Sequence, residues 1–489
     1  MTINQVINKV KENYPDADLD LLNLAYEFAA QAHGNQKRKT GEPYIQHSLH
    51  TAFTLALIKA DLNTVIAGIL HDVPEDTEVT LDDIKKNFGD DIAFLVEGIT
   101  KLSKIKYRGV ERYRESLRKM FLAMAEDLRV ILIKFCDRLH NLRTLDALPK
   151  EKRMRVARET MEIYAPIAGL LGIWRLKWQM EDICFKYLYP EEFKKLEYKY
   201  EIEKKAERNQ YSQKVKNILK KKLKESEMDF EIEDRFKHLY NIYTKMQKKD
   251  RKFDEIYDVF ALRVIVPNIP DCYKVLGIIH SIWKPKSDRI KDYIAVPKPN
   301  GYRSLHTTVF GPDNKATEFQ IRTKEMHDEA QYGIAAHWHY KAMAGDKAKL
   351  NKQPHWVKDI LNILRDNEGK KDDFISKIKV DVFKDRIFVF SPKGDVFDLP
   401  EDSTPIDFAY IVHTDIGHKT TASLINNKMA SLDQPLKNGD LVEIITDKNR
   451  KGPNRDWLKF VKTHRAKEKI NQATKASRFE QLKKIIPGI

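Results

Sequence analysis

The sequence has little cysteine and no long apolar run, and both absences restrict the class of protein. Its 489 residues include only three cysteines, Cys136, Cys184 and Cys272, which are widely separated and form no Cys-x-x-Cys pair. This spacing argues against a thiolate zinc site and for a reducing compartment, so we expect a cytoplasmic protein. No run reaches the roughly 18 apolar residues of a membrane span. The first residues also lack the charged and apolar regions of a secretory signal.

The charge is unbalanced towards the positive side. Lys and Arg number 87 against 72 Asp and Glu, which gives a formal net charge of +15. A basic surface favours anionic partners such as nucleotides, RNA or the ribosome, although Lys/Glu-rich sequences also form ordinary solvated helix faces. A chain of 489 residues is too long for one hydrophobic core, and its length predicts roughly three domains.

The period of the apolar residues changes along the chain. Residues 1–190 show helical spacing, as in Leu49–Ala56, and predict an all-helical domain. Residues 191–230 are dense in Lys and Glu and predict a charged helical linker, exposed along its length. Strand-like runs at 259–266, 306–310 and 317–321, followed by a helix from 325, predict a mixed α/β domain over 231–345. A connector over 346–380 then leads to a small β-rich module over 381–447.

Histidines and acids in the helical part form a pattern typical of a metal site. The pattern consists of His47, His71, Asp72, Glu75, Asp76, Asp137 and Asn141. Imidazole and carboxylate ligands suit Zn, Mn or Fe, and the carboxylate content favours Mn. One His-Asp pair is more often an ordinary helix face, but three separated elements favour a phosphate-ester hydrolase in which a metal ion activates water.

Two features next to this pattern bear on its geometry. Pro74 lacks a backbone N–H and should end or kink the helix beside Asp72, so that Glu75 and Asp76 are aimed differently from an unbroken helix. Arg38 and Lys39 precede His47 and either bind phosphate or belong to a solvated loop.

The middle domain carries the residues of a phosphotransferase. Asp258 begins one predicted strand and Glu318 lies in another, and such a site needs a Mg²⁺ ligand and an acceptor for a hydroxyl proton. Cations for a triphosphate are Arg235, Lys237, Lys245, Lys298 and Arg322. Gly301 lets Tyr302 present its ring for stacking on a base, although a single tyrosine is more often a core aromatic. A hydrolase and a phosphotransferase together predict a chain that makes and destroys one molecule.

With these motifs the chain resembles the long RelA/SpoT homologues, the bifunctional (p)ppGpp synthetase/hydrolases of the bacterial stringent response. The His47, His71-Asp72, Glu75-Asp76 and Asp137–Leu145 elements match the family's HD hydrolase. Asp258-x-x-Ala261-x-Arg263, Asp292–Thr307 and Glu318–Thr323 match its synthetase, and Asp407–Tyr410 with His413-Thr414 matches its TGS domain.

The resemblance implies the fold class. It predicts an all-α HD-type hydrolase domain, a mixed α/β nucleotidyltransferase-like synthetase domain and a small β-grasp-like TGS domain. Residues 448–489 are then the start of a helical regulatory region, and the further C-terminal regulatory domains of the family are expected to be lacking.

The resemblance also implies roles for single residues. In the hydrolase, Mn²⁺ would be bound by His47, His71, Asp72 and Asp137. Glu75 and Asp76 would activate the water that removes the 3′-pyrophosphate, and the nucleotide would lie against Arg38, Lys39, Asn141 and Thr144. In the synthetase, Asp258 would hold Mg²⁺, Glu318 would deprotonate the 3′-hydroxyl of GDP or GTP that attacks ATP, and Tyr302 would stack on guanine. The matched motifs place these residues at the synthetase nucleotides: Arg235, Lys237, Lys245, Arg263, Lys298, Asn300, Tyr302, His306, Gln320 and Arg322. His413 would contact an uncharged tRNA on the ribosome.

Three functions stay open. Arg289-x-Lys291-Asp292 is the basic form of a motif whose acidic form marks the synthetase-only branch. Together with the intact metal set it favours a bifunctional or hydrolase-weighted enzyme, a GTP pyrophosphokinase and (p)ppGpp 3′-pyrophosphohydrolase. Asp234-Arg235-Phe236-Lys237 replaces the family's usual Gly-Arg-Pro-Lys, which keeps open a hydrolase with a degenerate synthetase site. A non-catalytic regulator that binds tRNA and the ribosome is the third alternative. The sequence leaves the oligomeric state open.

Overall fold

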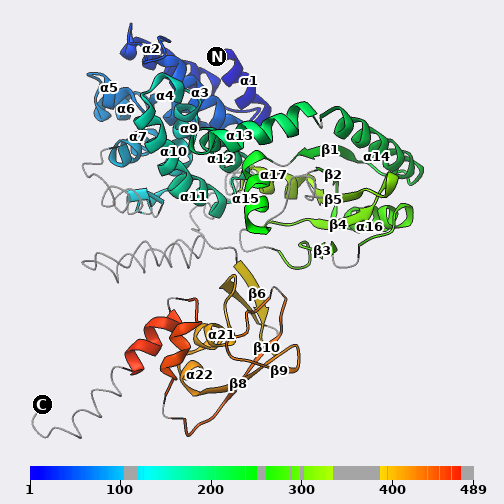
Figure 1. Cartoon of the computed structure of the whole chain (residues 1–489). Coiled ribbons are helices and arrows are strands. Elements are labelled where there is room, and N and C mark those ends of the chain that lie inside the picture. The colour runs from blue at the N-terminus through cyan, green and yellow to red at the C-terminus, as the bar shows by residue number, and fades with distance from the viewer. Residues whose placement is uncertain are drawn as a thin grey trace, which may run out of the picture. The chain divides into compact units, whose positions relative to one another are not determined.

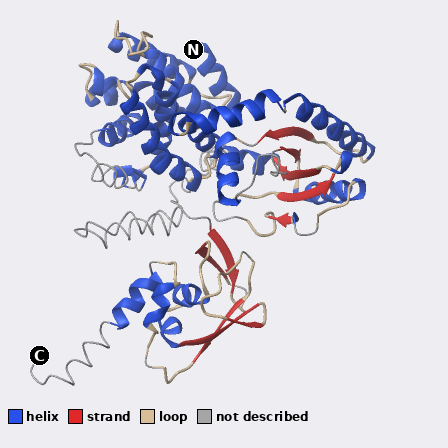
Figure 2. Ribbon diagram, in the orientation of Figure 1, coloured by secondary structure: helices blue, strands red, loops and turns tan. Residues whose placement is uncertain are grey.

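The computed structural model divides the chain into two compact units, residues 1–361 and 362–489. It describes these residues: 1–103, 119–120, 122–124, 126–203, 205–236, 238–249, 260–286, 289–297, 302–333, 386–393, 395–437, 439–450, 452–463 and 465–474. Figure 1 follows the chain through both units, and Figure 2 separates helices from strands. Among the described residues, no helix combines the length and apolar character needed to span a membrane.

The first part of the first unit is helical, as predicted. Asp18, Asp61, Thr80 and Asp127 each accept a hydrogen bond from a backbone N–H of the first turn and so begin a helix. The elements are α1 (Ile3–Asn13), α2 (Leu19–His33), α3 (Ile45–Leu57), α4 (Leu62–Leu70), α5 (Val73–Asp76), α6 (Leu81–Phe88), α7 (Asp90–Ser103), α9 (Leu128–Arg143), η1 (Leu145–Ala147), α10 (Lys150–Glu159), the π-helical η2 (Thr160–Tyr164), α11 (Ala165–Leu170) and α12 (Trp174–Leu188). Helices α3, α4, α7 and α9 pack against one another around a buried apolar core.

The break predicted at Pro74 is present. Helix α4 ends at Leu70, and the four-residue α5 begins at Val73 with the proline in its first turn. His71 and Asp72 therefore lie at the junction of two helices, and the stripe expected for one continuous helix from His71 to Asp76 is absent.

The charged segment after residue 190 forms α13 (Pro190–Glu197), the π-helical η3 (Tyr198–Glu203) and α14 (Lys205–Glu225). Composition predicted an exposed helix, but α14 buries Val215, Leu219 and Leu223 against the sheet of the middle domain. The reason is their spacing: residues four apart lie on one face, and three of them make an apolar stripe despite the surrounding lysines.

The middle domain is a five-stranded mixed sheet in the order β1-β2-β5-β4-β3. Its strands are β1 (Glu231–Phe236), β2 (Phe260–Val266), β3 (Lys291–Asp292), β4 (Leu305–Phe310) and β5 (Ala316–Thr323), and its further helices are α15 (Leu239–Lys249), α16 (Ile269–Ile282), the short η6 (Pro312–Asn314) and α17 (Lys324–Tyr332). Only β2 and β5 pair in parallel. The strands predicted at 306–310 and 317–321 correspond to β4 and β5, whereas β1 and β3 were not predicted.

Helices α14 and α16 cover one face of this sheet (Figures 1 and 2). Alternate residues of β2 and β5, such as Leu262 and Phe319, point to that face and form the core. The helical part and this domain also touch within the first unit. The Trp178 ring of α12 stacks on His238 at 3.8 Å, and Asp182 accepts a hydrogen bond from the Tyr240 N–H that begins α15.

The second unit contains the small β-rich module. Strands β6 (Arg386–Phe390) and β7 (Val396–Pro400) form one pair, and β8 (Thr420–Ile425), β9 (Lys428–Ala430) and β10 (Val442–Thr446) form a sheet in the order β10-β8-β9. Its helices are α21 (Pro405–Val412), α22 (Thr414–Lys419), the short η8 (Arg455–Lys459) and a last helix over 465–474, which buries Ala466 and Ile470 against α21. Buried Asp407 accepts hydrogen bonds from Thr404 and from the Thr463 N–H, which ties the start of α21 to the following segment. The predicted order of a helical, a mixed α/β and a small β-rich part is confirmed.

Candidate functional site

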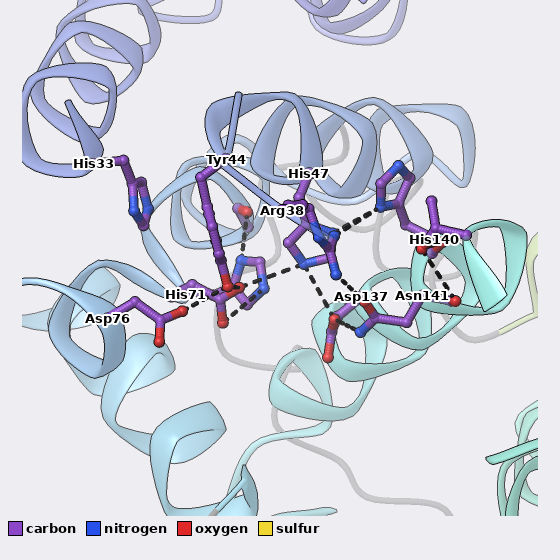
Figure 3. A network of polar contacts seen from close by, with 12 residues as sticks. His33, Arg38, Tyr44, His47, His71, Asp76, Asp137, His140 and Asn141 are labelled. Atoms are coloured by element: carbon purple, nitrogen blue, oxygen red, sulfur yellow. Dashed lines mark hydrogen bonds and ion pairs between the residues drawn. The ribbon is translucent and has the colours of Figure 1, made fainter. Parts of the chain in front are cut away.

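Three helical elements bring the predicted metal ligands together. His47 projects from α3, His71 from the end of α4 and Asp137 from α9, and one ligand atom of each lies within 4.8 Å of the others. All three side chains are buried, and Figure 3 shows how they lie within the network of polar contacts. The carboxylate of Asp72 adjoins them, 3.4 Å from His47 Nε2 and 3.3 Å from His71 Nε2. Two imidazoles and two carboxylates therefore converge on one point.

The donor set fits a divalent metal ion. His71 Nδ1 donates to the Gly68 carbonyl at 3.0 Å, which leaves the lone pair on Nε2. That Nε2 is buried and has no hydrogen-bond partner. A buried nitrogen lone pair without a donor, next to carboxylates, is the arrangement expected of a metal ligand. Mixed nitrogen and oxygen ligands suit Mn, Fe or Zn.

The charges at this cluster are those of a cation site. Burial alone would raise the pKa of Asp137, but Lys134 at 2.9 Å and His47 outweigh it and hold the pKa well below its usual range. Burial lowers the pKa of His71, so this ring stays neutral. For His47 burial acts in the same direction, but the hydrogen bonds to Asp137 and Asp72 outweigh it and raise the pKa. Neutral nitrogen and ionised oxygen ligands are therefore available together once the His47 proton is released.

Tyr44 is a functional candidate that the sequence reasoning did not assign. Its hydroxyl lies 2.5 Å from Asp76 Oδ2 and 3.0 Å from Asp72 Oδ2, so it bridges a candidate catalytic acid and a candidate metal ligand (Figure 3). The ring stacks on His33 at 4.6 Å. Burial, with the two carboxylates, raises the pKa of Tyr44 far above its usual value, so the hydroxyl remains a donor. Glu75 lies in α5 beside Asp76 and is exposed.

A cavity of about 430 Å³ adjoins the cluster. Lys37, Arg38, Lys39 and Lys152 give it a cationic side. Leu145, Leu148 and Val156 give it an apolar wall. Four of the predicted nucleotide contacts, Arg38, Lys39, Asn141 and Thr144, line this cavity. Lys37 and Lys152 were missed, because a lysine in a charged segment carries no signal of the cavity that it faces.

Hydrogen bonds connect the cavity to the cluster. Arg38 Nη2 donates to Asn141 Oδ1 at 2.5 Å, and Asn141 Nδ2 donates to Asp137 Oδ1 at 2.5 Å. Arg38 Nη1 also lies 3.2 Å from Nδ1 of His140, a residue of the same motif to which sequence reasoning gave no role. Burial and the neighbouring positive groups lower the pKa of His140 to about 2.

The second candidate site lies on the other face of the five-stranded sheet. The register aligns Arg235 with Ala261, Ala261 with Glu318, and Gln320 with His306. Side chains alternate between faces along a strand, so these positions share the face opposite α14 and α16. The predicted residues on it are Arg235, Arg263, His306, Glu318, Gln320 and Arg322. The alternation of polar and apolar residues within the strands was the signal that could have predicted this face.

Polar contacts concentrate around Glu318. Gln320 Nε2 donates to Glu318 Oε1 at 2.9 Å, and His306 Nδ1 and Arg235 Nη1 lie 3.7 and 3.9 Å from the same oxygen. Tyr302 adjoins this group, with its hydroxyl 2.8 Å from His306 Nε2. Arg322 is almost fully buried, and this burial lowers its pKa to about 9.

Four predicted residues, Asp258, Lys237, Lys298 and Asn300, lie outside the described part of the chain. Lys245 lies in α15 and is half-buried. Asp234, where the sequence departs from the resembled motif, turns to the helix-covered face and bonds Ser212 and Lys216 of α14.

In the second unit, His413 is exposed at the start of α22. Its Nδ1 accepts a hydrogen bond from the Asp415 N–H at 3.2 Å, which fixes the ring at the helix N-terminus.

Comparison with known proteins agrees with this division. Residues 25–174 match the HD domain, 234–345 the region found in RelA/SpoT proteins, and 387–446 the TGS domain. The chain is 44% identical over 476 residues to a GTP pyrophosphokinase of Myxococcus xanthus. The aligned region covers 96% of the chain and 62% of that protein. It is 44% identical to a guanosine-3′,5′-bis(diphosphate) 3′-pyrophosphohydrolase of Aquifex aeolicus, with 98% of the chain and 68% of that protein covered.

A third relative is the bifunctional (p)ppGpp synthase/hydrolase SpoT of Escherichia coli, which is 43% identical over 481 residues. The match covers 97% of the chain and 68% of that protein. The chain thus spans about two thirds of the length of these relatives. It contains the HD domain, the RelA/SpoT region and the TGS domain in that order. It belongs to the RelA/SpoT family.

Proposed function

We propose that the chain is a bifunctional enzyme that transfers pyrophosphate from ATP to the 3′-hydroxyl of GDP or GTP and also removes it from (p)ppGpp. One observation carries most of this proposal: a buried His/Asp cluster adjoins a cavity with a cationic side and an apolar wall. A guanine nucleotide with diphosphate groups at its 3′ and 5′ positions has the matching distribution of charge and apolar surface. The relatives' names cover both reactions.

In the hydrolase we assign a divalent ion, Mn²⁺, to His47, His71, Asp72 and Asp137. When bound, such an ion lowers the pKa of a water molecule and neutralises phosphate charge. Glu75, with Asp76 beside it, would accept the proton of the attacking water as the water oxygen forms a bond to the phosphorus next to the 3′-oxygen. The bond between this phosphorus and the 3′-oxygen breaks, which yields GDP or GTP and pyrophosphate.

Other side chains of the cavity hold the substrate and the acids in place. Arg38 and Lys39 neutralise the phosphates, Asn141 and Thr144 line the cavity, and Asn141 also donates a hydrogen bond to Asp137. The Tyr44 hydroxyl bonds both Asp76 and Asp72. It therefore keeps Asp76, beside the proton acceptor, close to the metal ligand.

In the synthetase, Glu318 accepts the proton of the acceptor 3′-hydroxyl, whose oxygen attacks the β-phosphorus of ATP and releases AMP. We assign Mg²⁺ to Asp258, and Arg235 and His306 each lie within 4 Å of Glu318. The position of Asp234 supports a working site rather than a degenerate one. Its side chain bonds Ser212 and Lys216 of α14 on the helix-covered face, away from the face that carries Arg235.

We further assign the small β-rich module to recognition of uncharged tRNA on the ribosome, with exposed His413 as the contact. Cytoplasmic location is part of this proposal, and the three free, buried cysteines support a reducing compartment.

A paired assay on the purified chain tests the proposal. One tube contains ppGpp and Mn²⁺. The other contains ATP, GDP and Mg²⁺ with an Asp72→Ala variant, so that the product survives. Nucleotide chromatography showing turnover in both tubes is the expected result. Hydrolysis alone would support a degenerate synthetase instead, and inactivity in both tubes would leave only a binding role with tRNA and the ribosome.

A further inference from the structure

One histidine of the metal cluster, His47, is joined nitrogen to nitrogen with His140, which lies behind it. His47 Nδ1 lies 2.7 Å from His140 Nδ1, which is a short hydrogen bond between two rings that both carry alternative tautomers (Figure 3). One proton lies between them. If it belongs to His140, then the proton of a neutral His47 ring is on Nε2, and that nitrogen cannot bind a metal ion. The position of one proton therefore decides whether His47 is a ligand.

Arg38 identifies the ring that holds this proton. Its Nη1 lies 3.2 Å from the same Nδ1 of His140. A guanidinium has only donors, so the His140 nitrogen that it meets must be an acceptor. His140 Nδ1 is then unprotonated, and its lone pair accepts the hydrogen bonds from Arg38 and from His47. The proton between the two rings therefore belongs to His47 Nδ1.

We infer that His140, held by Arg38, is a positioning residue that fixes the tautomer of His47 and presents its Nε2 lone pair to the metal ion. This inference rests on the metal site of the proposed function. His47 Nε2 faces Asp137 Oδ1 at 3.2 Å and Asp72 Oδ2 at 3.4 Å, which is the direction that the ion requires. A hydrogen bond on the far nitrogen of a ligand histidine commonly sets ring orientation and metal affinity.

The other histidine of the cluster uses the same arrangement with a different acceptor. His71 Nδ1 donates to the Gly68 carbonyl at 3.0 Å, and a carbonyl has no alternative protonation state. His47 lies in the first turn of α3, where the nearest acceptor is a side chain of another helix, so its tautomer depends on His140 and Arg38. The two ligands therefore differ in a way that an experiment can separate.

The helix spacing keeps His140 in place. His47 and His50 are three residues apart on α3, and Asp137 and His140 are three apart on α9, so the two pairs face each other one turn apart. The His50 ring stacks on His140 at 4.6 Å and 22°. His140 is only 5% exposed, which excludes competing water from the bond.

The first test measures metal affinity without nucleotide, from the electron paramagnetic resonance signal of free Mn²⁺. His140→Leu removes the acceptor, and we expect Mn²⁺ affinity to fall by about 10- to 100-fold. His140→Gln offers a carbonyl oxygen to the same proton and should restore most of that loss. His280→Leu is the control, because it makes the same change at a partly buried histidine of α16, whose ring bonds Thr307 in the middle domain, and it should leave affinity within about threefold of the parent chain.

The second test reads the proton itself. With Co²⁺ in place of Mn²⁺, the Nδ1–H of each histidine bound through Nε2 gives a strongly shifted, exchangeable proton resonance. The unmodified chain should show two such resonances that exchange slowly with water. In His140→Leu the His47 resonance should be lost to exchange, while that of His71 remains as an internal reference.

The outcomes separate this inference from the metal site. Failure of the parent chain to bind Mn²⁺ or Co²⁺ would contradict the proposed function. Normal binding by the parent with unchanged affinity in His140→Leu, or an equal loss in His140→Gln and His140→Leu, would overturn the role of His140 alone. If His140→Leu does not fold, the parent spectrum still decides: a single slowly exchanging resonance would overturn the inference.

Discussion

Tyr44→Phe gives the sharpest test of the hydrolase assignment, since it removes one oxygen atom and keeps the ring. The lost hydroxyl donates to Asp76 at 2.5 Å and lies 3.0 Å from Asp72. Phenylalanine retains the stack on His33, so the free energy of unfolding should change little. The high pKa of Tyr44 means that this donor is present at every working pH.

The magnitude follows from the charge of the acceptors. A hydrogen bond to a charged group contributes about 1.5–3 kcal/mol, and about 1.4 kcal/mol corresponds to a tenfold change in rate. One hydroxyl proton is shared by two carboxylates, so the lower part of that range applies. We expect kcat for ppGpp hydrolysis to fall by about 10- to 30-fold, with synthesis from ATP and GDP unchanged.

The assay is steady-state hydrolysis of ppGpp at saturating Mn²⁺, with Tm measured on the same samples. Tyr14→Phe is the control, since that hydroxyl is also partly buried and donates to the Lys59 carbonyl at 2.9 Å, away from the cluster. It should keep the parent rate. A Tyr44→Phe chain that hydrolyses ppGpp at the parent rate would refute the bridging role of Tyr44.

Three further predictions concern the other parts of the first unit. Glu318→Gln should reduce synthesis by about 10²- to 10⁴-fold and leave hydrolysis intact, as followed by nucleotide chromatography; continued synthesis would exclude Glu318 as the proton acceptor. Leu219→Ala should lower the free energy of unfolding by about 2–5 kcal/mol in a urea titration, whereas the 69%-exposed Met429→Ala should have almost no effect; equal effects would contradict the burial of α14. Burial raises the pKa of Asp182 to about 6, so the folded state holds a proton that the unfolded chain releases, and stability falls as pH rises from about 4 to 6. Asp182→Asn should therefore increase the free energy of unfolding at pH 8 by on the order of 2 kcal/mol, with a higher Tm, and leave both unchanged at pH 4. An equal change in Tm at both pH values would rule out this titration.

The residue types of the first site could be predicted from the sequence alone. His71, Asp72 and Asp137 stand in short motifs whose residue types already indicate metal binding, and Pro74 predicted the helix break because a missing N–H acts on its own turn. The geometry brings three of the predicted ligands together as those motifs require. The roles of Tyr44 and His140 were not readable, since each depends on partners that are 28 to 102 positions away in the chain.

The sequence was also sufficient for the order of domains, because helical and strand periods are local properties of the chain. It misjudged α14, whose burial depends on the sheet that its apolar stripe meets. The single polar face with Arg235, His306 and Glu318 likewise required the strand register, which is set by pairing between segments far apart in the chain. Side-chain chemistry and local period are carried by neighbouring residues, whereas burial, tautomer and convergence on a site are decided only when distant segments pack together.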